Sequence, residues 1–219
     1  MEHKLQVAPD ANALASMAAS YVVSLAKAAA VERGRFTFAV SGGHTPWAMF
    51  AAFRNEYMPW ADVELFQVDE RIAPDGDPDR NLTHLRESIG DVPALVHPMP
   101  VNDPDLDAAT SAYAALLPER FDLMHLGLGP DGHTASLVPG DPVLDATNDL
   151  VAVTQPYDGH RRMTLTYPAL ARAGQVLWLV TGPDKRDALA KLLAGDESIP
   201  AARVKAGRSL IMADESAVP

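Results

Sequence analysis

The chain has 219 residues, of which 47% are hydrophobic and 21% charged, and this suits a single globular domain over residues 1–219. Its formal net charge of −11 argues against binding to nucleic acid or to an anionic membrane, because both would repel the chain as a whole. The absence of cysteine excludes disulfides and thiolate nucleophiles, and it fits a cytoplasmic protein. We see no secretory leader and no run approaching about 18 apolar residues, so we expect no membrane span. We also expect a monomer or weak homo-oligomer.

The first predicted element is a long amphipathic helix over residues 10–32. Alanine is abundant there, apolar side chains recur near helical spacing, and Gly34 stands where the helix would be capped. Short apolar, β-branched or aromatic runs follow, separated by segments of helical character. These runs predict strands over residues 36–40, 63–68, 121–126, 150–153 and 176–180. The alternation predicts an α/β fold with a mainly parallel sheet covered by helices.

Polar, glycine-rich segments follow four of these strands. Their sequences are SGGHTP after residue 40, DERIAP after 68, PDGHTAS after 129 and TGPDK after 180. In an open parallel sheet, ligands bind outside the carboxyl ends of the strands, so we expect the four segments to converge on one site. Strand-to-helix turns are often glycine-rich for backbone reasons alone, but that alternative does not require four such segments together.

The segment SGGHTP has the composition of a phosphate-binding turn that begins at Ser41. Gly42 and Gly43 let backbone N–H groups approach an anion closely, Thr45 can cap a following helix, and Pro46 suits its first turn. A plain turn is the alternative interpretation. The segment lacks the Gly-Lys-Ser/Thr of a Walker loop, and Ser41 lacks the Gly-x-Ser-x-Gly elbow of a nucleophile.

Ionic side chains stand near the ends of two predicted strands. Arg71, next to Asp69 and Glu70, can grip a phosphate through two parallel hydrogen bonds, and Lys185 can add a point charge. An acidic protein needs such local cations to hold an anionic ligand. Asp69 and Arg162 are further candidates for substrate binding in the same pocket, although surface salt bridges or a solvated role would also explain these charged side chains.

The segment from Gly127 to Gly132 spells the Gly-x-Gly-x-x-Gly pattern of dinucleotide-binding proteins. That pattern requires a long helix after its glycines, whereas Pro139 and Gly140 would end any helix within about eight residues of Gly132. We therefore interpret the match as accidental. Glycines that bring backbone close to a ligand, next to Asp131 and His133, instead indicate a site where an imidazole meets the substrate.

The sequence predicts no metal site. Its histidines form no pair of the His-Glu-x-x-His type, and His125, inside an apolar strand, is predicted to be a core or supporting residue. The run Asp75-x-Asp77-x-Asp79 begins like a calcium loop but lacks the glycine and the glutamate that such a loop needs. We interpret it as a solvated loop.

Several motifs, taken in order between about residues 36 and 190, resemble the 6-phosphogluconolactonases. They are SGGHTP, VDER, the loop that ends at Arg80-Asn81, GLGPDGHTASLVPG, RMTLT and TGPDK. The resemblance implies a Rossmann-like sheet with helices on both faces, as in the glucosamine-6-phosphate deaminases. It also implies hydrolysis of 6-phospho-D-glucono-1,5-lactone to 6-phospho-D-gluconate in the cytoplasmic oxidative pentose phosphate pathway, with no required cofactor.

The resemblance also implies roles for individual residues. His133 would be the general base that takes a proton from the water attacking the lactone carbonyl, and the SGGHTP segment, Arg71 and Lys185 would bind the phosphate. The backbone N–H groups of Gly129 and its neighbours are candidates for the oxyanion, and Asp131 either orients His133 or binds sugar hydroxyls. His44 and Arg80 stand where relatives more often carry serine, and we expect them to tune the pocket.

Two other functions are consistent with parts of the sequence. A sugar-phosphate deaminase typically has an Asp-Glu-Tyr segment and continues its Asp-Gly-His loop into Ala-Phe-Asn-Glu-Pro. Here Arg71 follows Asp69-Glu70, and the loop after His133 has no such glutamate, which favours the lactonase. A catalytically silent sugar-phosphate sensor is the other alternative, but we find no DNA-binding helix pair or basic face, and His133 would have no role.

Overall fold

The computed structural model describes residues 2–219, and its main sheet has seven strands in the order β1-β10-β9-β6-β2-β3-β5. A second sheet has three strands in the order β4-β8-β7. The strands are β1 (His3–Ala8), β2 (Phe36–Val40), β3 (Val63–Gln67), β4 (Asp69–Arg71), β5 (Leu95–His97), β6 (Leu123–Gly127), β7 (Val151–Val153), β8 (Arg162–Leu165), β9 (Val176–Val180) and β10 (Ser209–Asp214). The α-helices are α1 (Ala11–Arg33), α2 (His44–Ala52), α3 (Asn81–Ile89), α4 (Leu106–Leu116), α5 (Tyr167–Leu170) and α6 (Arg186–Ala194).

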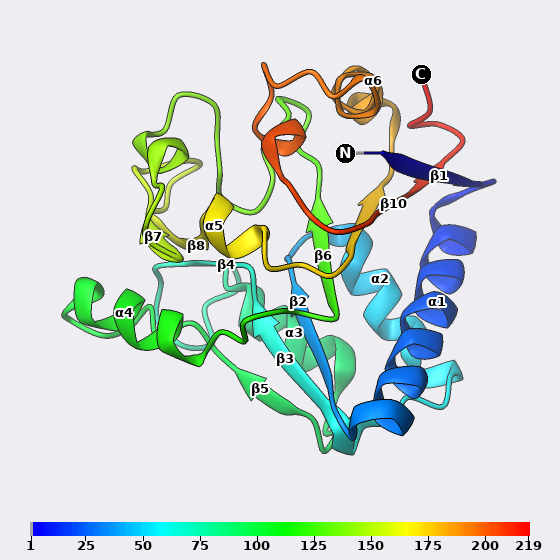
Figure 1. Ribbon diagram of the computed structural model, residues 1–219, viewed down its shortest axis with the longest axis horizontal. Helices are drawn as coiled ribbons and strands as arrows, with labels where there is room; N and C mark the ends of the chain where they lie inside the picture. The colour runs from blue at the N-terminus through cyan, green and yellow to red at the C-terminus, as the bar shows by residue number, and fades with distance from the viewer. Residues whose placement is uncertain (1) are drawn as a thin grey trace.

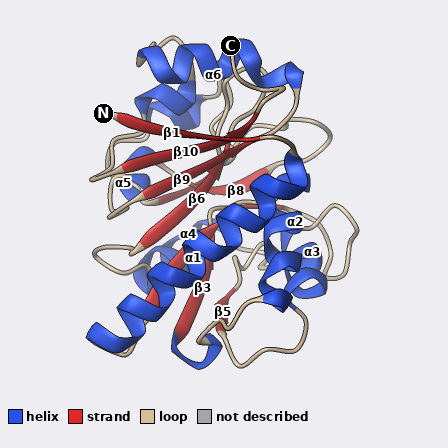
Figure 2. Cartoon of the chain, turned by 90° about the vertical axis from the view of Figure 1, so that its right-hand side faces the viewer, coloured by secondary structure: helices blue, strands red, loops and turns tan. Residues whose placement is uncertain are grey.

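Helices cover both faces of the seven-stranded sheet, in which all neighbouring strands run parallel. Along β2, Phe36 and Phe38 pack with α1, α2 and α3, whereas Ala39 packs with the opposite core under α4, α5 and α6. Trp178 of β9 belongs to that second core and Leu177 to the first. Side chains alternate between the faces of a strand, so a strand buried on both faces is apolar throughout. The Rossmann-like α/β prediction is confirmed (Figures 1 and 2).

The first predicted helix forms α1, one residue later at each end than expected. Asp10 caps its start, because its Oδ1 accepts a hydrogen bond from the N–H of Ala13 at 2.8 Å. Gly34 ends the helix in the left-handed region with φ of 65°, where glycine carries no steric penalty. The predicted cap at Gly34 is therefore confirmed.

Helix α1 corrects one expectation drawn from the sequence. An 18-residue window within it has mean hydropathy 1.5, so by length and composition alone it could cross a membrane. The expectation that no stretch approaches a membrane span was wrong in this respect. However, eight side chains of α1 are buried in the structure, and the core helix of a folded domain passes the same test. The hydropathy of α1 is thus a weak indication of a membrane.

The second sheet departs from the predicted arrangement. Residues 151–153 form a strand as expected, but β7 pairs antiparallel with β8 rather than joining the parallel sheet. The DER segment, expected to be a loop, is strand β4, which also pairs antiparallel with β8. The physical reason is that Val68 N–H donates to Val40 while the Val68 carbonyl accepts from Leu165, so the chain leaves one sheet for the other at this residue. The small sheet therefore begins at the edge of the large one.

The chain order creates a crevice between β2 and β6. From β2 the sheet grows through β3 to β5 on one side, and from β6 through β9 to β10 and β1 on the other. Such a change of direction leaves adjacent loops diverging at the carboxyl ends of the two central strands, which is where ligands bind in open α/β sheets. The segments after β2 and β6 are SGGHTP and the GLGPDGHTAS loop.

Candidate active site

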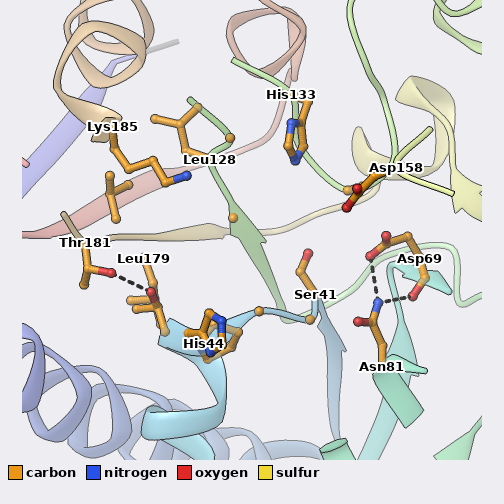
Figure 3. A pocket seen from close by; sticks show the side chains of 18 of the residues that line it. Ser41, His44, Asp69, Asn81, Leu128, His133, Asp158, Leu179, Thr181 and Lys185 are labelled. Atoms are coloured by element: carbon orange, nitrogen blue, oxygen red, sulfur yellow. Dashed lines mark hydrogen bonds between the residues drawn. The ribbon is translucent and has the colours of Figure 1, made fainter. Parts of the chain in front are cut away.

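A cavity of about 490 Å³ opens at this crevice, and all four predicted segments line it. Figure 3 shows His133, Asp158, Ser41 and Lys185 arranged around one space. Ten of the eleven predicted site residues line the cavity: Ser41, Gly42, Gly43, Thr45, Asp69, Arg71, Gly129, His133, Arg162 and Lys185. Asp131 does not line it but contacts His133. The convergence of the four segments is therefore confirmed, whereas the roles of the residues stay predictions.

The SGGHTP segment places the start of α2 at the cavity. Gly43 is the N-cap residue, with φ of 123°, and no side chain caps the helix. The predicted cap by Thr45 is therefore wrong: this residue already lies within the helix, and its Oγ1 is 2.7 Å from Oγ1 of Thr181. The first N–H groups of α2 have no partner within the helix, so this end of the helix suits an anion.

Buried His125 supports the same segment from β6. The Ser41 N–H donates to His125 Nδ1 at 3.4 Å, and Ser41 Oγ donates to the His125 carbonyl at 3.2 Å. Burial lowers the pKa of His125 to about 3, so the imidazole is neutral and its Nδ1 can accept. The prediction that His125 is a core or supporting residue is confirmed, and the Ser41 hydroxyl donates to a backbone carbonyl rather than to a basic side chain.

Asn81, not predicted as a site residue, connects the SGGHTP segment to the DERIAP segment. Its Nδ2 donates to the Asp69 carbonyl at 3.0 Å, and its Oδ1 accepts a hydrogen bond from Arg71 Nη1. A Cβ added to Gly42 would lie 1.9 Å from Asn81 Oδ1. Gly42 is therefore required for the close approach of Asn81, a packing relation that sequence spacing does not reveal.

Asp69 is a buried carboxyl at the edge of the cavity. Burial raises its pKa, although a hydrogen bond from Ser136 Oγ at 2.6 Å and the charge of Arg71 act in the opposite direction. Figure 3 shows Asp69 beside Asn81. Neighbours on two loops therefore hold the Asp69 carboxyl group in place. His133, by contrast, has one ring nitrogen that forms no hydrogen bond within the described residues.

His133 is held by Asp131 in one orientation. Asp131 Oδ1 lies 2.6 Å from His133 Nδ1 and also accepts the His133 backbone N–H at 3.0 Å. A carboxylate beside Nδ1 favours the tautomer with the proton on that nitrogen, which leaves the lone pair of Nε2 available. Burial by itself raises the pKa of Asp131, but the backbone N–H and ring of His133 outweigh burial and hold this pKa below its usual range. The carboxylate is therefore charged at neutral pH.

Gly129 packs directly under the His133 ring. A Cβ at this position would lie 2.1 Å from His133 Nδ1, so only glycine allows the ring its observed place. The Gly129 N–H donates to the His133 carbonyl at 2.8 Å. The expectation that this N–H stabilises an oxyanion is therefore wrong, because the loop already uses it as an internal hydrogen bond.

Two arginines lie side by side on neighbouring strands of the small sheet. Arg71 and Arg162 are register partners in β4 and β8, and both line the cavity. Burial, followed by the nearby charge of Arg71, lowers the pKa of Arg162. Within residues 2–219 neither side chain forms an ion pair with a carboxylate, and the buried Nε of Arg162 has no hydrogen-bond partner. An anion in the cavity would relieve the repulsion between the two guanidinium groups.

The loop between β7 and β8 adds Tyr157 and Asp158, which sequence reasoning missed. The guanidinium carbon of Arg162 lies 5.0 Å from the Tyr157 ring centroid, and the rings of Tyr157 and His133 are 5.7 Å apart. Asp158 has a positive φ of 48°. The motif RMTLT, which begins at Arg162, does not reveal this loop, because the place of the loop over the cavity depends on the antiparallel pairing of β7 with β8.

Lys185 enters the cavity from the opposite side, at the start of α6. Its Nζ lies 3.1 Å from Asp184 Oδ2, and the Asp184 side chain is 61% exposed, so this ion pair is weak and exchangeable. Arg80, by contrast, lies outside the cavity. It is buried behind the site in an ion pair with Glu70, so the expectation that Arg80 tunes the pocket was wrong, whereas His44 does line the cavity.

Within residues 2–219, no three His, Asp or Glu side chains gather as potential metal ligands. The Gly-x-Gly-x-x-Gly segment leads into turns and a short 3-10 helix over Pro142–Asp145, without the long helix that dinucleotide binding requires. Fold and site together define an α/β protein whose central crevice carries unpaired cations and an oriented histidine.

Comparison with known proteins identifies the family. Residues 9–212 match the family described as glucosamine-6-phosphate isomerases/6-phosphogluconolactonase. The 6-phosphogluconolactonase of Mycobacterium tuberculosis is 36% identical over 225 residues, covering 92% of this chain and 91% of that protein, and the one from Synechocystis sp. is 38% identical over 181 residues, covering 76% and 75%. The chain belongs to this family, which confirms the predicted resemblance.

Solved structures agree on the fold. The crystal structure of 6-phosphogluconolactonase from Thermotoga maritima matches with a TM-score of 0.87 and covers 98% of this chain and 100% of that chain. The sequence identity is 24%, so this likeness concerns the fold alone.

Proposed function

We propose that the chain hydrolyses 6-phospho-D-glucono-1,5-lactone to 6-phospho-D-gluconate, in the cytoplasm and without a cofactor. The observation that carries the proposal is the contact of 2.6 Å between His133 Nδ1 and Asp131, which leaves Nε2 free beside a cation-lined cavity. The names of the curated relatives support the same activity. A lactone is an activated ester, so a positioned water and a base suffice without a covalent intermediate.

The reaction uses one proton relay. Neutral His133 accepts a proton at Nε2 from the water whose oxygen adds to C1 of the lactone. The bond between C1 and the ring oxygen then breaks, and His133 returns the proton to that oxygen. Asp131 keeps the imidazole in the required tautomer and stabilises the imidazolium while it carries the proton. This assigns Asp131 the orienting role rather than a contact with sugar hydroxyls.

The phosphate binds away from the reacting carbon, among groups that lack strong carboxylate partners of their own. The start of α2 offers backbone N–H groups, and Arg71 and Lys185 add charge. Arg162 lies beside Arg71 and extends this positive region toward Tyr157. Binding energy from the phosphate holds C1 near His133.

A deaminase and a silent sensor are the alternatives, and substrate assays separate them. We expect acid release from 6-phosphogluconolactone above its spontaneous hydrolysis and no ammonia release from glucosamine 6-phosphate. Ammonia without lactone hydrolysis would establish the deaminase. Tight binding of 6-phosphogluconate without turnover of either compound would establish the sensor.

The phosphate contacts can be tested by removing one cation at a time. Arg71→Ala or Lys185→Ala should raise KM for the phosphorylated lactone roughly ten- to hundredfold with a smaller change in kcat, because each lost charge-assisted contact costs about 1.5–3 kcal/mol. Steady-state kinetics measure both constants. Arg86→Ala, at an exposed position on α3, is the control and should leave KM unchanged. A normal KM in both cavity variants would show that the phosphate lies elsewhere.

The packing of Gly129 provides a test of the His133 position. Gly129→Ala places a methyl group 2.1 Å from His133 Nδ1, so the ring must move away from Asp131. We expect kcat to fall by up to about 10²-fold, as for other small misplacements of a reacting group. Gly127→Ala controls for added bulk, because Gly127 lines the same cavity but a Cβ there meets no atom within 4 Å. Unchanged kcat in Gly129→Ala would mean that the ring position is not critical.

A further inference from the structure

A second concave site lies at the amino ends of the main-sheet strands, opposite the end that carries the candidate active site. It has a volume of about 790 Å³ and contains the arginines Arg33, Arg35, Arg120 and Arg208, together with Asp122. We name these five residues the basic groove. The proposed reaction uses none of them.

The sheet order explains why these arginines meet. Arg208 directly precedes β10, and Gly174 stands just before β9. Arg120 stands just before β6, and Arg35 directly precedes β2. The strands β10, β9, β6 and β2 are consecutive neighbours and parallel, so their amino ends lie in one row. The groove is thus built from four segments far apart in sequence.

Positive charge in the basic groove exceeds what its carboxylate neutralises. Asp122 is occupied, because it accepts from the Thr37 N–H at 2.9 Å and from Arg33 Nη2 at 2.6 Å. Arg35 lies 3.7 Å from Glu64 Oε1. The side chains of Arg120 and Arg208 form no hydrogen bond or ion pair within the part of the chain that the structure describes. The Arg120 and Arg208 guanidinium groups therefore make the groove locally positive, although the chain as a whole has a net charge of −11.

Glycine at position 174 lets one of these arginines lie against the backbone. A Cβ at Gly174 would lie 3.0 Å from Arg120 Nε and 2.8 Å from the Phe121 carbonyl oxygen. The Gly174 N–H donates to that same carbonyl at 2.8 Å. The close approach places the Arg120 guanidinium against the backbone that lines the groove.

We propose that the basic groove binds a small molecule with several phosphate charges, such as a nucleoside polyphosphate. Guanidinium groups match phosphate oxygens through paired hydrogen bonds, and a concave site with several of them favours a compact oligoanion over a single one. The groove is independent of the candidate active site. Strand β2 separates Arg35 from Ser41, and its length at about 3.3 Å per residue puts the two sites on the order of 20 Å apart.

Binding of sodium tripolyphosphate, measured by isothermal titration calorimetry, tests this proposal. We compare the unmodified protein with Arg120→Ala/Arg208→Ala, with Arg71→Ala/Lys185→Ala in the active-site cavity, and with Arg86→Ala/Lys191→Ala as a matched loss of two exposed charges. With the active-site cavity occupied by excess 6-phosphogluconate, the dissociation constant should rise at least about tenfold in the first variant only, and it should rise with added salt in the unmodified protein. The Arg120 and Arg208 side chains form no internal hydrogen bonds or ion pairs, so this variant should keep its melting temperature.

The remaining outcomes overturn the proposal. Loss of binding only in Arg71→Ala/Lys185→Ala would place the oligoanion in the active-site cavity. Equal weakening in all three double variants would show a response to net charge alone. Absence of binding to the unmodified protein would show that the arginines are simply solvated. Lactone hydrolysis by Arg120→Ala/Arg208→Ala should be unchanged, which separates this inference from the proposed function.

Discussion

Replacing His133 with asparagine should lower kcat for lactone hydrolysis by roughly 10² to 10⁴, the usual contribution of a general base. Asparagine is polar and smaller than histidine, so the loop can keep its fold. Its side chain cannot take a proton from water at neutral pH. Binding of 6-phosphogluconate should be largely preserved, because the cations proposed to hold the phosphate lie on other loops. The spontaneous hydrolysis of the lactone must be subtracted at each substrate concentration.

The pH profile provides a second measurement of the same role. The pKa of Asp131 lies below its usual range, so this carboxylate stays charged as the medium is acidified through the range where imidazoles gain a proton. Protonation of Asp131 would remove the partner that orients His133, so kcat/KM should fall when the medium is acidic enough to protonate this carboxylate. Asp131→Asn should also lower kcat, since an amide can present its N–H to Nδ1 and favour the wrong tautomer.

His84→Asn is the control for the histidine substitution. His84 lies on α3, is 41% exposed in its side chain and does not line the cavity. This variant should match the unmodified protein. A folded His133→Asn variant with near-normal kcat above the background would show that another group activates the water. Asp69 would be the first candidate, because it lines the same cavity and burial raises its pKa.

The elements that were predicted correctly are those whose local pattern matches their tertiary environment. Helix α1 has helical periodicity with a cap at each end. Strand β9 is a continuous apolar run and β2 an apolar run interrupted only by Thr37, and both are buried on both faces. Strands β4 and β7 have three residues each, too few to show a period. Strand β1 carries Leu5 and Val7 on one face, but both are exposed, so no buried apolar run marks it in the sequence. The pairing of such strands depends on contacts between distant segments.

In the candidate site too, local sequence patterns predicted some residues, whereas others depend on contacts between distant segments. Glycine, histidine and arginine in loops after strands predicted the cavity, because parallel strands bring those loops together. Asn81 and Tyr157 could not be selected, since one lies at a helix start and the other in a hairpin of the second sheet. The roles expected for the Thr45 side chain and the Gly129 N–H failed for a related reason: both groups already have partners inside the protein. Composition identifies a donor, but only the structure shows whether it is free.

Glu70 should be the most costly side chain to remove near the site, although it does not line the cavity. Its carboxylate is fully buried and accepts hydrogen bonds of 2.8 Å from four N–H donors, which are Gln67 Nε2 and the backbone groups of Arg71, Asn81 and Leu82. Arg80 Nε lies 3.1 Å from Glu70 Oε2 and is also buried. The carboxylate thus caps the start of α3 and neutralises Arg80.

Glu70→Ala should therefore lower the free energy of unfolding by about 3–5 kcal/mol, because it leaves several buried donors unsatisfied and leaves the buried Arg80 guanidinium with only the exposed carboxylate of Asp75 as an ion-pair partner. Urea denaturation followed by circular dichroism measures the change. Glu87→Ala, at an exposed position on α3, is the control and should change stability by less than about 0.5 kcal/mol. The double variant Glu70→Ala/Arg80→Met should recover part of the loss, since no charge is then left buried without a partner. If Glu70→Ala is no less stable than Glu87→Ala, or if the double variant is worse than the single one, the carboxylate does not stabilise this region through Arg80 and the start of α3.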